Sequence, residues 1–163
     1  MRLLLVIALS VGLSLAGELN IYTVVIGKVS KVYVREGDRV KKGQPLMEID
    51  PALYLAEKHR LMGKRAEINA RMWKVERDYR RLKELFERDL LAETRLEDQK
   101  IKYDTLKAQL QQVEGELKRV ETLISYTVIT SPVGGRVVKI LAPEGSYVNG
   151  ELQPQPVMVI EVR

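Results

Sequence analysis

Cysteine is absent from the chain, and histidine, tryptophan and phenylalanine each occur once in 163 residues. The lack of cysteine excludes disulfides, thiolate nucleophiles, iron–sulfur clusters and zinc sites built on cysteine. A single histidine excludes every site that needs two imidazoles. Aromatic residues make up only 6% of the chain, which argues against a large compact core because such cores are built partly on these side chains.

Catalytic motifs are missing as well. The sequence has no G-x-S-x-G, no phosphate-binding loop and no HExxH, so we expect no enzyme activity, no bound cofactor and no metal site. His59 and Met62 are three residues apart, but two soft ligands do not make a metal site, and methionine more often fills gaps in packing. The net charge is only +5, from 27 basic and 22 acidic residues that are interleaved along the chain.

Residues 1–16 have the pattern of an export signal. A short basic start precedes an uncharged run over residues 3–16, which ends in Ser14-Leu15-Ala16, a small-x-small cleavage pattern. The run is shorter than the roughly 20 apolar residues that span a bilayer. We therefore predict a cleaved signal peptide, with an uncleaved anchor as the alternative. Export would also remove nucleic acid as a partner.

Two blocks of sequence, residues 27–40 and 135–148, resemble each other. Aligned without gaps, they share six of 14 positions, whereas chance would give about one. The identical pairs are Gly27/Gly135, Val29/Val137, Lys31/Lys139, Glu36/Glu144, Gly37/Gly145 and Val40/Val148. We interpret the two blocks as an internal repeat.

Both blocks have the character of β-structure. Short apolar or alternating runs, several of them rich in β-branched residues, occupy 29–34, 46–49, 126–130 and 157–162. Neither block can bury a core alone, so we expect 17–50 and 126–163 to meet in one small β-sandwich. Turn residues hold backbone conformations that other residues avoid. The positions predicted to do so are Gly27, Gly37, Gly43, Pro132, Gly135 and Gly145.

The intervening residues 51–125 have a helical period instead. Apolar side chains recur at alternating steps of four and three, which is the spacing of a coiled-coil seam. The first run is Leu61, Ile68, Met72, Val75, Tyr79, Leu82 and Phe86, with a break at Arg65. The second run is Leu96, Tyr103, Leu106, Leu110, Val113, Leu117, Val120 and Ile124, with only Gln99 polar. These runs predict an antiparallel helical hairpin roughly 50 Å long.

Signals at the helix ends set the boundaries of this hairpin. Asp50 precedes Pro51, which is the combination of an N-cap with proline at the first helical position. Residues 87–94 form the tip, and Thr94-x-x-Glu97 matches a capping box for the second helix. A hairpin returns the chain to its starting point, so the flanking halves can pair. The predicted fold is α+β, a small β-sandwich made of two half-motifs and interrupted by a long antiparallel coiled-coil hairpin.

Two further features lie outside the seam. Gly63 and Gly115 each cost about 1 kcal/mol relative to alanine inside a helix, and they fall within about a turn of each other across the hairpin. We interpret them as a hinge, with close packing as the alternative.

Residues 51–80 carry a local charge of +4, which is typical of a solvated face and also suits contacts between hairpins.

The two β half-motifs, in this order around a hairpin, resemble a known family. The first half-motif is Gly27-x-Val29-x-x-Val32-x-Val34-x-Glu36-Gly37-Asp38-x-Val40-x-x-Gly43-Gln44-x-Leu46-x-x-Ile49-Asp50, and the second is Tyr126-Thr127-x-Ile129-x-Ser131-Pro132-x-Gly134-Gly135-x-Val137. Together they resemble the split lipoyl-like domain of HlyD-type periplasmic adaptors, also called membrane fusion proteins. The resemblance covers about residues 21–163. A lipoyl or biotin carrier fits poorly, because the turn that holds the carrier lysine is replaced here by the hairpin.

The resemblance implies a role in transport. Such adaptors form homo-oligomeric rings, often hexamers, in the periplasm, either free or associated with the inner membrane. They bridge an inner-membrane transporter of the ABC, RND or MFS type to a TolC-type outer-membrane channel, which the hairpin tip meets. In channel-docking members the tip resembles Arg-x3-Leu-x6-Ser. The matching positions here are Arg81, Leu85 and Ala92, with alanine in place of serine.

The resemblance also sets an expectation about missing parts. Typical members continue into a β-barrel domain and a membrane-proximal domain, neither of which follows Arg163 in this sequence. We expect either a minimal adaptor that depends on a partner chain or a truncated reading frame. The alternative function is a periplasmic coiled-coil structural or interaction protein without a transporter.

Overall fold

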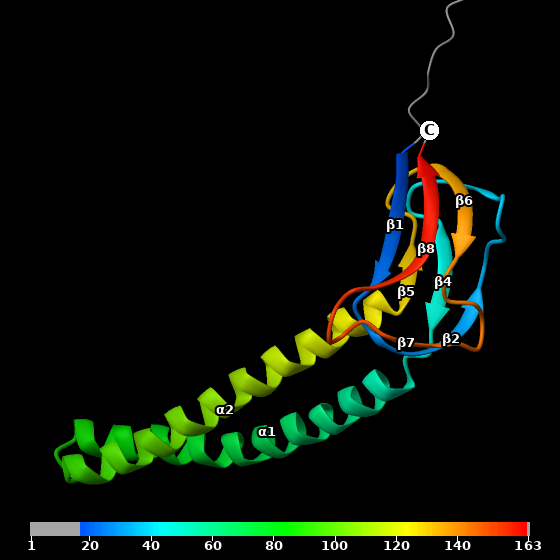
Figure 1. The fold of residues 1–163 in the computed structure, drawn as a ribbon. Coiled ribbons are helices and arrows are strands. Elements are labelled where there is room, and N and C mark those ends of the chain that lie inside the picture. Colours follow the sequence, from blue (N-terminus) through cyan, green and yellow to red (C-terminus); the bar gives the residue numbers. More distant parts are fainter. Residues whose placement is uncertain (1–16, 163) are drawn as a thin grey trace, which may run out of the picture. The chain divides into compact units, whose positions relative to one another are not determined.

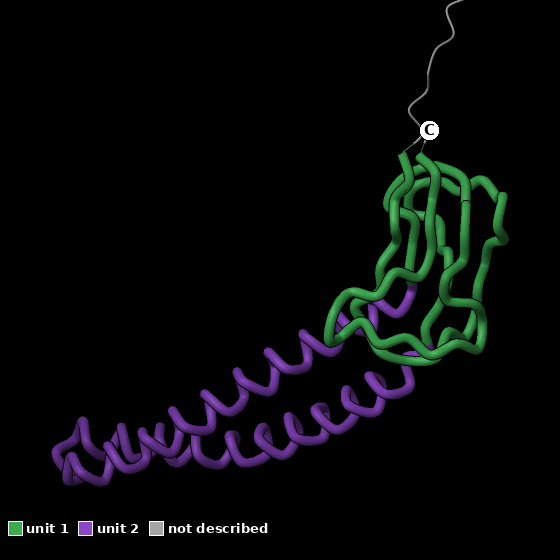
Figure 2. Tube along the Cα trace, in the orientation of Figure 1, with its two compact units in different colours: residues 1–49, 129–163 green, residues 50–128 purple. Residues whose placement is uncertain are grey.

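The computed structural model describes residues 17–162. The predicted signal peptide, residues 1–16, lies outside the described residues. The chain divides into two compact units (Figure 2). A β unit combines residues up to 49 with residues from 129 onward, and a helical unit comprises residues 50–128.

The β unit holds two four-stranded sheets (Figure 1). Its strands are β1 (Gly17–Thr23), β2 (Ile26–Val32), β3 (Arg39–Val40), β4 (Pro45–Ile49), β5 (Val128–Thr130), β6 (Gly135–Ile140), β7 (Tyr147–Asn149) and β8 (Gln155–Val162). One sheet has the order β1-β8-β6-β3 and the other β5-β4-β2-β7. Each sheet therefore takes strands from both sides of the helical insert, which confirms the predicted fold class.

The internal repeat explains how the two halves hold each other. In the first sheet β3 pairs with β6, so that Val40 faces Gly135. In the second sheet β2 pairs with β7, so that Gly27 faces Val148. These are equivalent positions of the repeat, exchanged between the halves. Each half supplies one long and one short strand, and pairs both of them with strands of the other half.

Backbone hydrogen bonds next to the repeated glycines follow the same exchange. Gly37 N–H donates to the carbonyl of Val137 at 2.8 Å, and Gly145 N–H donates to the carbonyl of Val29 at 2.9 Å. Gly37 and Gly145 have φ of 91° and 87°, in the left-handed region where glycine carries no Cβ penalty. Gly37 and Gly145 therefore stand where the chain turns to reach the other half. The other repeated pair, Gly27 and Gly135, lies within strands β2 and β6 and not at turns.

The two repeated glutamates also form hydrogen bonds between the halves. Glu36 Oε1 accepts a hydrogen bond from the backbone N–H of Ile140 at 2.9 Å, and Glu144 Oε2 accepts one from the N–H of Val32 at 3.4 Å. Each carboxylate satisfies a backbone donor on the opposite half. The identities in the sequence thus belong to residues that join the halves.

Apolar residues from both halves fill the interior of the β unit. The fully buried ones are Val25, Val29, Leu46, Met47, Ile49, Val137, Val148, Val157, Met158 and Ile160. Among the described residues no buried side-chain nitrogen or oxygen lacks a hydrogen-bond partner.

Two strand predictions need correction. The strand predicted over 126–130 begins only at Val128, because α2 continues through Tyr126 and Thr127 N–H still bonds to the Ile124 carbonyl at 3.1 Å. Strand β1 was not predicted as a strand. It pairs along β8 and alternates inward residues with exposed polar ones.

The helical unit is an antiparallel pair formed by α1 (Ala52–Glu87) and α2 (Glu93–Tyr126) (Figure 1). Helix α1 begins one residue later than predicted. Asp50 nevertheless satisfies a free donor of the first turn, since its Oδ1 accepts a hydrogen bond from Ala52 N–H at 2.9 Å. The seam prediction is confirmed along most of the hairpin. Its buried residues include Leu61, Ile68, Val113, Leu117 and Val120.

The seam prediction is wrong at its last position on α1. Phe86 is 36% exposed, and Leu85 is half-buried instead. The helix ends at Glu87, so its last turn is shaped by the connection to α2 rather than by a continuing heptad.

Polar contacts fix the register of the two helices. The rings of Tyr79 and Tyr103 stack with centroids 5.5 Å apart and an interplanar angle of 11°. Gln99, the one polar residue of the second seam run, donates from Nε2 to the Val75 carbonyl at 3.1 Å. These groups occupy seam positions where other turns place aliphatic residues, so they specify which residues of α1 and α2 face each other.

Candidate interaction surfaces

The tip of the hairpin is a tight turn fixed by backbone hydrogen bonds. Leu90 N–H donates to the Leu85 carbonyl and Asp89 N–H donates to the Phe86 carbonyl, both at 3.0 Å. Asp89 has φ of 57°. This is a Schellman motif in which aspartate stands at the position usually taken by glycine. Helix α1 therefore ends at a defined point, and residues 88–92 reverse the chain.

The structure places all three predicted docking residues at or near this turn. Arg81 is exposed on α1, and Leu85 is half-buried in its last turn. Ala92 is the N-cap residue of α2, with extended φ and ψ of −69° and 139° and no capping side chain. The predicted capping box is therefore wrong. Helix α2 begins at Glu93, so Thr94 lies within the first turn, while the position of the docking motif's serine coincides with the N-cap.

An exposed aromatic lies on the outer side of α1. Trp73 is 67% exposed, and the Arg77 guanidinium lies 4.7 Å from the centroid of its ring. Together with Glu76, Arg80, Arg81 and Glu84 they line a concave surface of about 460 Å³ on this helix, and Arg80 forms an ion pair with Glu76 within it.

The sequence prediction counted Arg77 and Arg80 within the +4 charge of residues 51–80 and assigned no role to Trp73. One signal in the sequence could have located it. Trp73 follows the seam residue Met72 directly, so it lies off the seam and faces outward.

Charged pairs on the helices are exposed. Lys58 Nζ lies 2.8 Å from Glu121 Oε1 across the hairpin, and this hydrogen bond lowers the pKa of Glu121. Arg60 likewise lowers the pKa of Glu57, mainly through its hydrogen bonds to that carboxylate. Such exposed pairs contribute little stability. Their shifts are those of surface ion pairs, and both groups lie outside any enclosed site.

The predicted hinge glycines have no close neighbours. A Cβ built on Gly63 or on Gly115 would meet nothing within 4 Å. Close packing, the alternative explanation for these glycines, is therefore excluded. A helix interior loses about 1 kcal/mol at each glycine relative to alanine.

A second concave surface lies on the β unit. It has a volume of about 730 Å³, and the charged side chains lining it are all cationic. These are Arg39, Lys41, Lys42 and Arg136. Gly135 lies beside it and packs tightly against β8, since a Cβ there would come within 2.3 Å of the Glu161 carbonyl oxygen. The lining includes no carboxylate and no hydroxyl.

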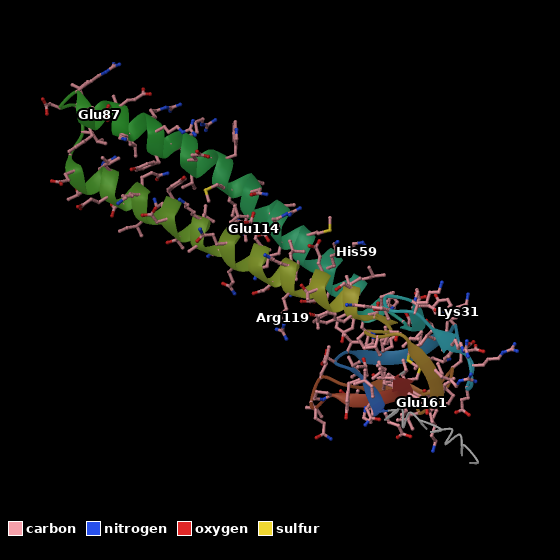
Figure 3. The ribbon with its side chains drawn as sticks, turned by 90° about the horizontal axis from the view of Figure 1, so that it is seen from above. Lys31, His59, Glu87, Glu114, Arg119 and Glu161 are labelled. Atoms are coloured by element: carbon pink, nitrogen blue, oxygen red, sulfur yellow. The ribbon has the colours of Figure 1, made fainter. Side chains whose placement is uncertain are left out.

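The described residues offer neither a metal-binding cluster nor a membrane-spanning helix. Residues 17–162 contain no group of three or more histidine, aspartate or glutamate side chains placed so that they could hold a metal ion. His59 is exposed on α1 toward the end of the hairpin remote from Glu87 (Figure 3). Over the same residues, neither helix is apolar enough to cross a bilayer.

A family model described as the RND MFP barrel-sandwich hybrid domain matches residues 18–161. The match includes both halves of the repeat and the whole hairpin. The chain belongs to the RND membrane fusion protein family. The membrane fusion protein domain therefore accounts for nearly all of the described residues.

Relatives of this membrane fusion protein agree with the match. It is 29% identical over 133 residues to multidrug resistance protein MdtA of Pantoea ananatis, covering 82% of this chain and 32% of the relative. Among solved structures, MacA from Actinobacillus actinomycetemcomitans superposes with a TM-score of 0.73 at 26% identity, covering 88% of this chain and 48% of MacA. ZneB from Cupriavidus metallidurans shares the fold, with a TM-score of 0.64 at 22% identity, over 89% of this chain and 60% of ZneB.

The chain matches only part of each relative, so the comparison concerns that shared part alone. This chain spans about a third of the length of the curated relatives that it matches. The shared part consists of the two-sheet body and the hairpin. Its resemblance to MacA thus concerns the same two units that the structure shows.

Proposed function

We propose that this chain is a periplasmic adaptor of an efflux complex, which joins an inner-membrane transporter to an outer-membrane channel. The observation that carries the proposal is the family match over residues 18–161, which includes the hairpin as well as the β unit. An antiparallel helical pair with one buried seam leaves its outer faces and its tip available to other molecules. The body and hairpin would work mechanically, with no chemistry at a catalytic centre.

The tip is the part of the chain proposed to meet the channel. It is closed by a defined Schellman turn. Arg81 and Leu85 follow the docking pattern, whereas Ala92 stands in place of its serine. We propose Arg81, Leu85 and Ala92 as the channel-facing positions. Gly63 and Gly115 would supply the bend that lets the hairpin follow changes in the complex.

The comparisons also favour one class of transporter. The matching family model is that of RND adaptors, so we propose an RND-type transporter as the inner-membrane partner. The name of the curated relative from Pantoea, a multidrug resistance protein, favours small toxic compounds as cargo. Several copies would assemble side by side, with six as the expected number, at the outer face of the inner membrane.

Site-specific photocrosslinking in the native cell tests this proposal. A photoreactive amino acid is placed at Ala92, at the hairpin tip, and in a matched control at Leu152, which is 89% exposed on the β unit. Mass spectrometry then identifies the captured proteins. We expect an outer-membrane channel with the probe at residue 92 and none with the control, and an inner-membrane transporter in the complex purified through this chain.

The alternative makes a different prediction. A periplasmic coiled-coil protein without a transporter would yield only itself or cell-wall proteins at both positions. That result would contradict the proposed adaptor role.

A further inference from the structure

The cationic concave surface of the β unit lies at the open edge of one sheet. Strand β3 is the edge strand of the β1-β8-β6-β3 sheet, and its Arg39 is the direct cross-strand partner of Arg136 on β6. Lys41 and Lys42 come just after β3, and both are exposed. We call these four residues the cationic hollow, since they line the concave surface of about 730 Å³.

Two arginines placed opposite each other carry a cost. Like charges on directly opposed residues destabilise a β-sheet. Arg39 is exposed, so packing does not require an arginine there. Within residues 17–162 none of the four cationic side chains of the hollow forms an ion pair. A local arrangement that costs stability and is not compensated within the fold is typical of a functional site, here one that waits for an anion.

The carboxylates nearest in strand register and in sequence do not neutralise the hollow. Glu161 on β8, labelled in Figure 3, is the cross-strand partner of Arg136 on its other side, but it does not line the hollow. Asp38 precedes Arg39, and its Oδ2 accepts a hydrogen bond from Arg35 N–H at 2.8 Å, which holds it in its own turn. Even with both carboxylates counted against the four cations, a charge of +2 remains.

Hydrogen bonds hold the walls of the hollow in place. Arg136 donates from one Nη to the Gly37 carbonyl at 3.1 Å, which orients its guanidinium and leaves other N–H donors for a ligand. The two loops beside it are joined, because Gly43 N–H donates to the Ser131 carbonyl at 2.7 Å and Ser131 N–H donates to the Gln44 carbonyl at 2.9 Å. Walls that are already ordered reduce the entropy lost when a ligand binds.

The side chains of the hollow fit a phosphate that has an apolar neighbour. The arginine fork matches phosphate oxygens bidentately, and two adjacent forks can hold a single phosphate. A group of four cations also suits a multiply charged anion better than one carboxylate. The volume is in the range of sites for small ligands. Gln44 and four apolar residues provide the other side chains of the lining, and the apolar ones are Val40, Pro132, Val133 and Val162.

We propose that the cationic hollow binds the phosphate group of an amphiphilic anion. Arg39 and Arg136 hold the phosphate oxygens, and the apolar part of the ligand lies against Pro132 and Val133. A phospholipid headgroup and a dispersed phosphate ester share this chemistry. The hollow lies wholly within the β unit, so the proposal goes beyond the adaptor role and does not depend on it.

Calorimetric titration of the full chain tests the site. The probe is dihexanoyl phosphatidic acid below its micelle concentration, compared with hexanoate and with inorganic phosphate. We expect saturable binding of the probe, and binding at least about tenfold weaker for hexanoate, which lacks the phosphate, and for inorganic phosphate, which lacks the apolar part.

Two variants show whether the arginine fork is used. Arg39→Lys keeps the charge but removes the fork, so it should weaken binding of the probe at least about tenfold. Lys139→Gln removes one positive charge of the β unit outside the hollow, and it should leave binding unchanged.

Thermal unfolding separates a binding role from a structural one. Arg39→Gln removes the repulsion from Arg136, so the melting temperature of the free chain should be maintained or raised. The increase in melting temperature that the probe gives the parent chain should be lost in this variant. A residue needed only for folding would instead lower the melting temperature with and without the probe.

Vesicles identify the source of the phosphate. Co-sedimentation with phosphatidylcholine vesicles that contain phosphatidic acid, but not with phosphatidylcholine alone, would support a membrane lipid as the ligand. Binding of the short-chain probe without co-sedimentation would support a dispersed phosphate ester.

Four results would overturn the proposal. They are no binding of the phosphatidic acid probe, equal affinity for hexanoate or inorganic phosphate, unchanged binding in Arg39→Lys, and an equal loss of binding in Lys139→Gln.

Discussion

The β unit and the helical unit use their apolar residues in different ways. In the β unit, Leu46 and Ile160 are fully buried, and the strands of each half pair with those of the other. In the helical unit only one side of each helix is closed, and the outer sides expose Trp73 and Ile101. Side chains project outward along the whole hairpin (Figure 3).

This difference teaches how the two units divide the work. The interior of the β unit is closed between its two sheets, so its buried positions are determined mainly by packing and by turns. The hairpin has a single seam, so most of its surface is free to meet other molecules. Changes at buried positions of the β unit should therefore act on stability, whereas changes on the outer faces of the hairpin should act on association.

The largest effect is expected from truncating a leucine in the β unit. Leu46→Ala should lower the free energy of unfolding by about 2–5 kcal/mol, because it removes buried methyl groups and leaves a cavity. Leu117→Ala, in the hairpin seam, should fall at the lower end of that range, since the seam can relax toward solvent. Chemical denaturation measures both. Leu152→Ala, an exposed change, serves as the control and should stay within about 0.5 kcal/mol.

The comparison would fail if Leu117→Ala cost more than Leu46→Ala. That order would mean that the seam, rather than the two-sheet interior, is the better packed part of the molecule.

Adjacent glycines in the β unit provide a sharper test of packing. Gly135→Ala should destabilise the chain by about 1–3 kcal/mol through overpacking, because the new Cβ would clash with the Glu161 carbonyl and the Ile160 side chain. Gly134→Ala is the matched change, since its Cβ would lie 3.8 Å from the nearest backbone atom, the Val40 carbonyl oxygen. Thermal and chemical denaturation should separate the two variants, and equal losses would contradict the close approach of β6 and β8.

Glycines in the hairpin should behave in the opposite way. Gly63→Ala and Gly115→Ala meet open space, so each should stabilise the helical unit by about 1 kcal/mol. Spin labels at Glu87 and Arg119, both exposed, measure the distribution of distances along the hairpin. A hinge predicts a narrower distribution in the double variant than in the parent, and an unchanged width would remove the hinge from the account.

An effect no larger than that of a single hairpin glycine is expected at the tip. Ala92→Ser would place a hydroxyl at the N-cap of α2, where it can accept a hydrogen bond from the first turn, and should stabilise the hairpin by about 1 kcal/mol. Thr94→Ala, within that turn, should change stability by less. Denaturation followed by helical circular dichroism checks both. If Thr94→Ala were the more costly change, Thr94 rather than residue 92 would be the capping position.

Local patterns in the sequence were enough to predict the hairpin and the β halves. The heptad spacing that includes Leu61 and Leu117 depends only on neighbouring turns, and the repeat depends on a direct alignment. The same local reasoning failed at Tyr126 and Thr127. Their composition predicted a strand, but the backbone hydrogen bonds of α2 continue through them. It also missed β1, which has no counterpart in the repeat and is defined by its pairing with β8.

The contacts between halves could not be predicted in this way. The hydrogen bond from Ile140 to Glu36 joins residues that are 104 positions apart, so its existence depends on how the two halves are placed. Trp73 was missed for a related reason. An aromatic residue is usually assigned to a core, and only the structure shows that this one faces outward.

The central claim is that the segments before and after the hairpin pair with each other to form the single β unit. A pair of engineered cysteines tests this claim most directly. Lys28 and Tyr147 are exposed cross-strand partners on β2 and β7, within the Cα separation that a disulfide requires. In the Lys28→Cys, Tyr147→Cys variant we predict rapid intramolecular disulfide formation on mild oxidation, in contrast to a Lys28→Cys, Lys139→Cys control. Failure of the first pair to close, or equal closure of both pairs, would contradict the account.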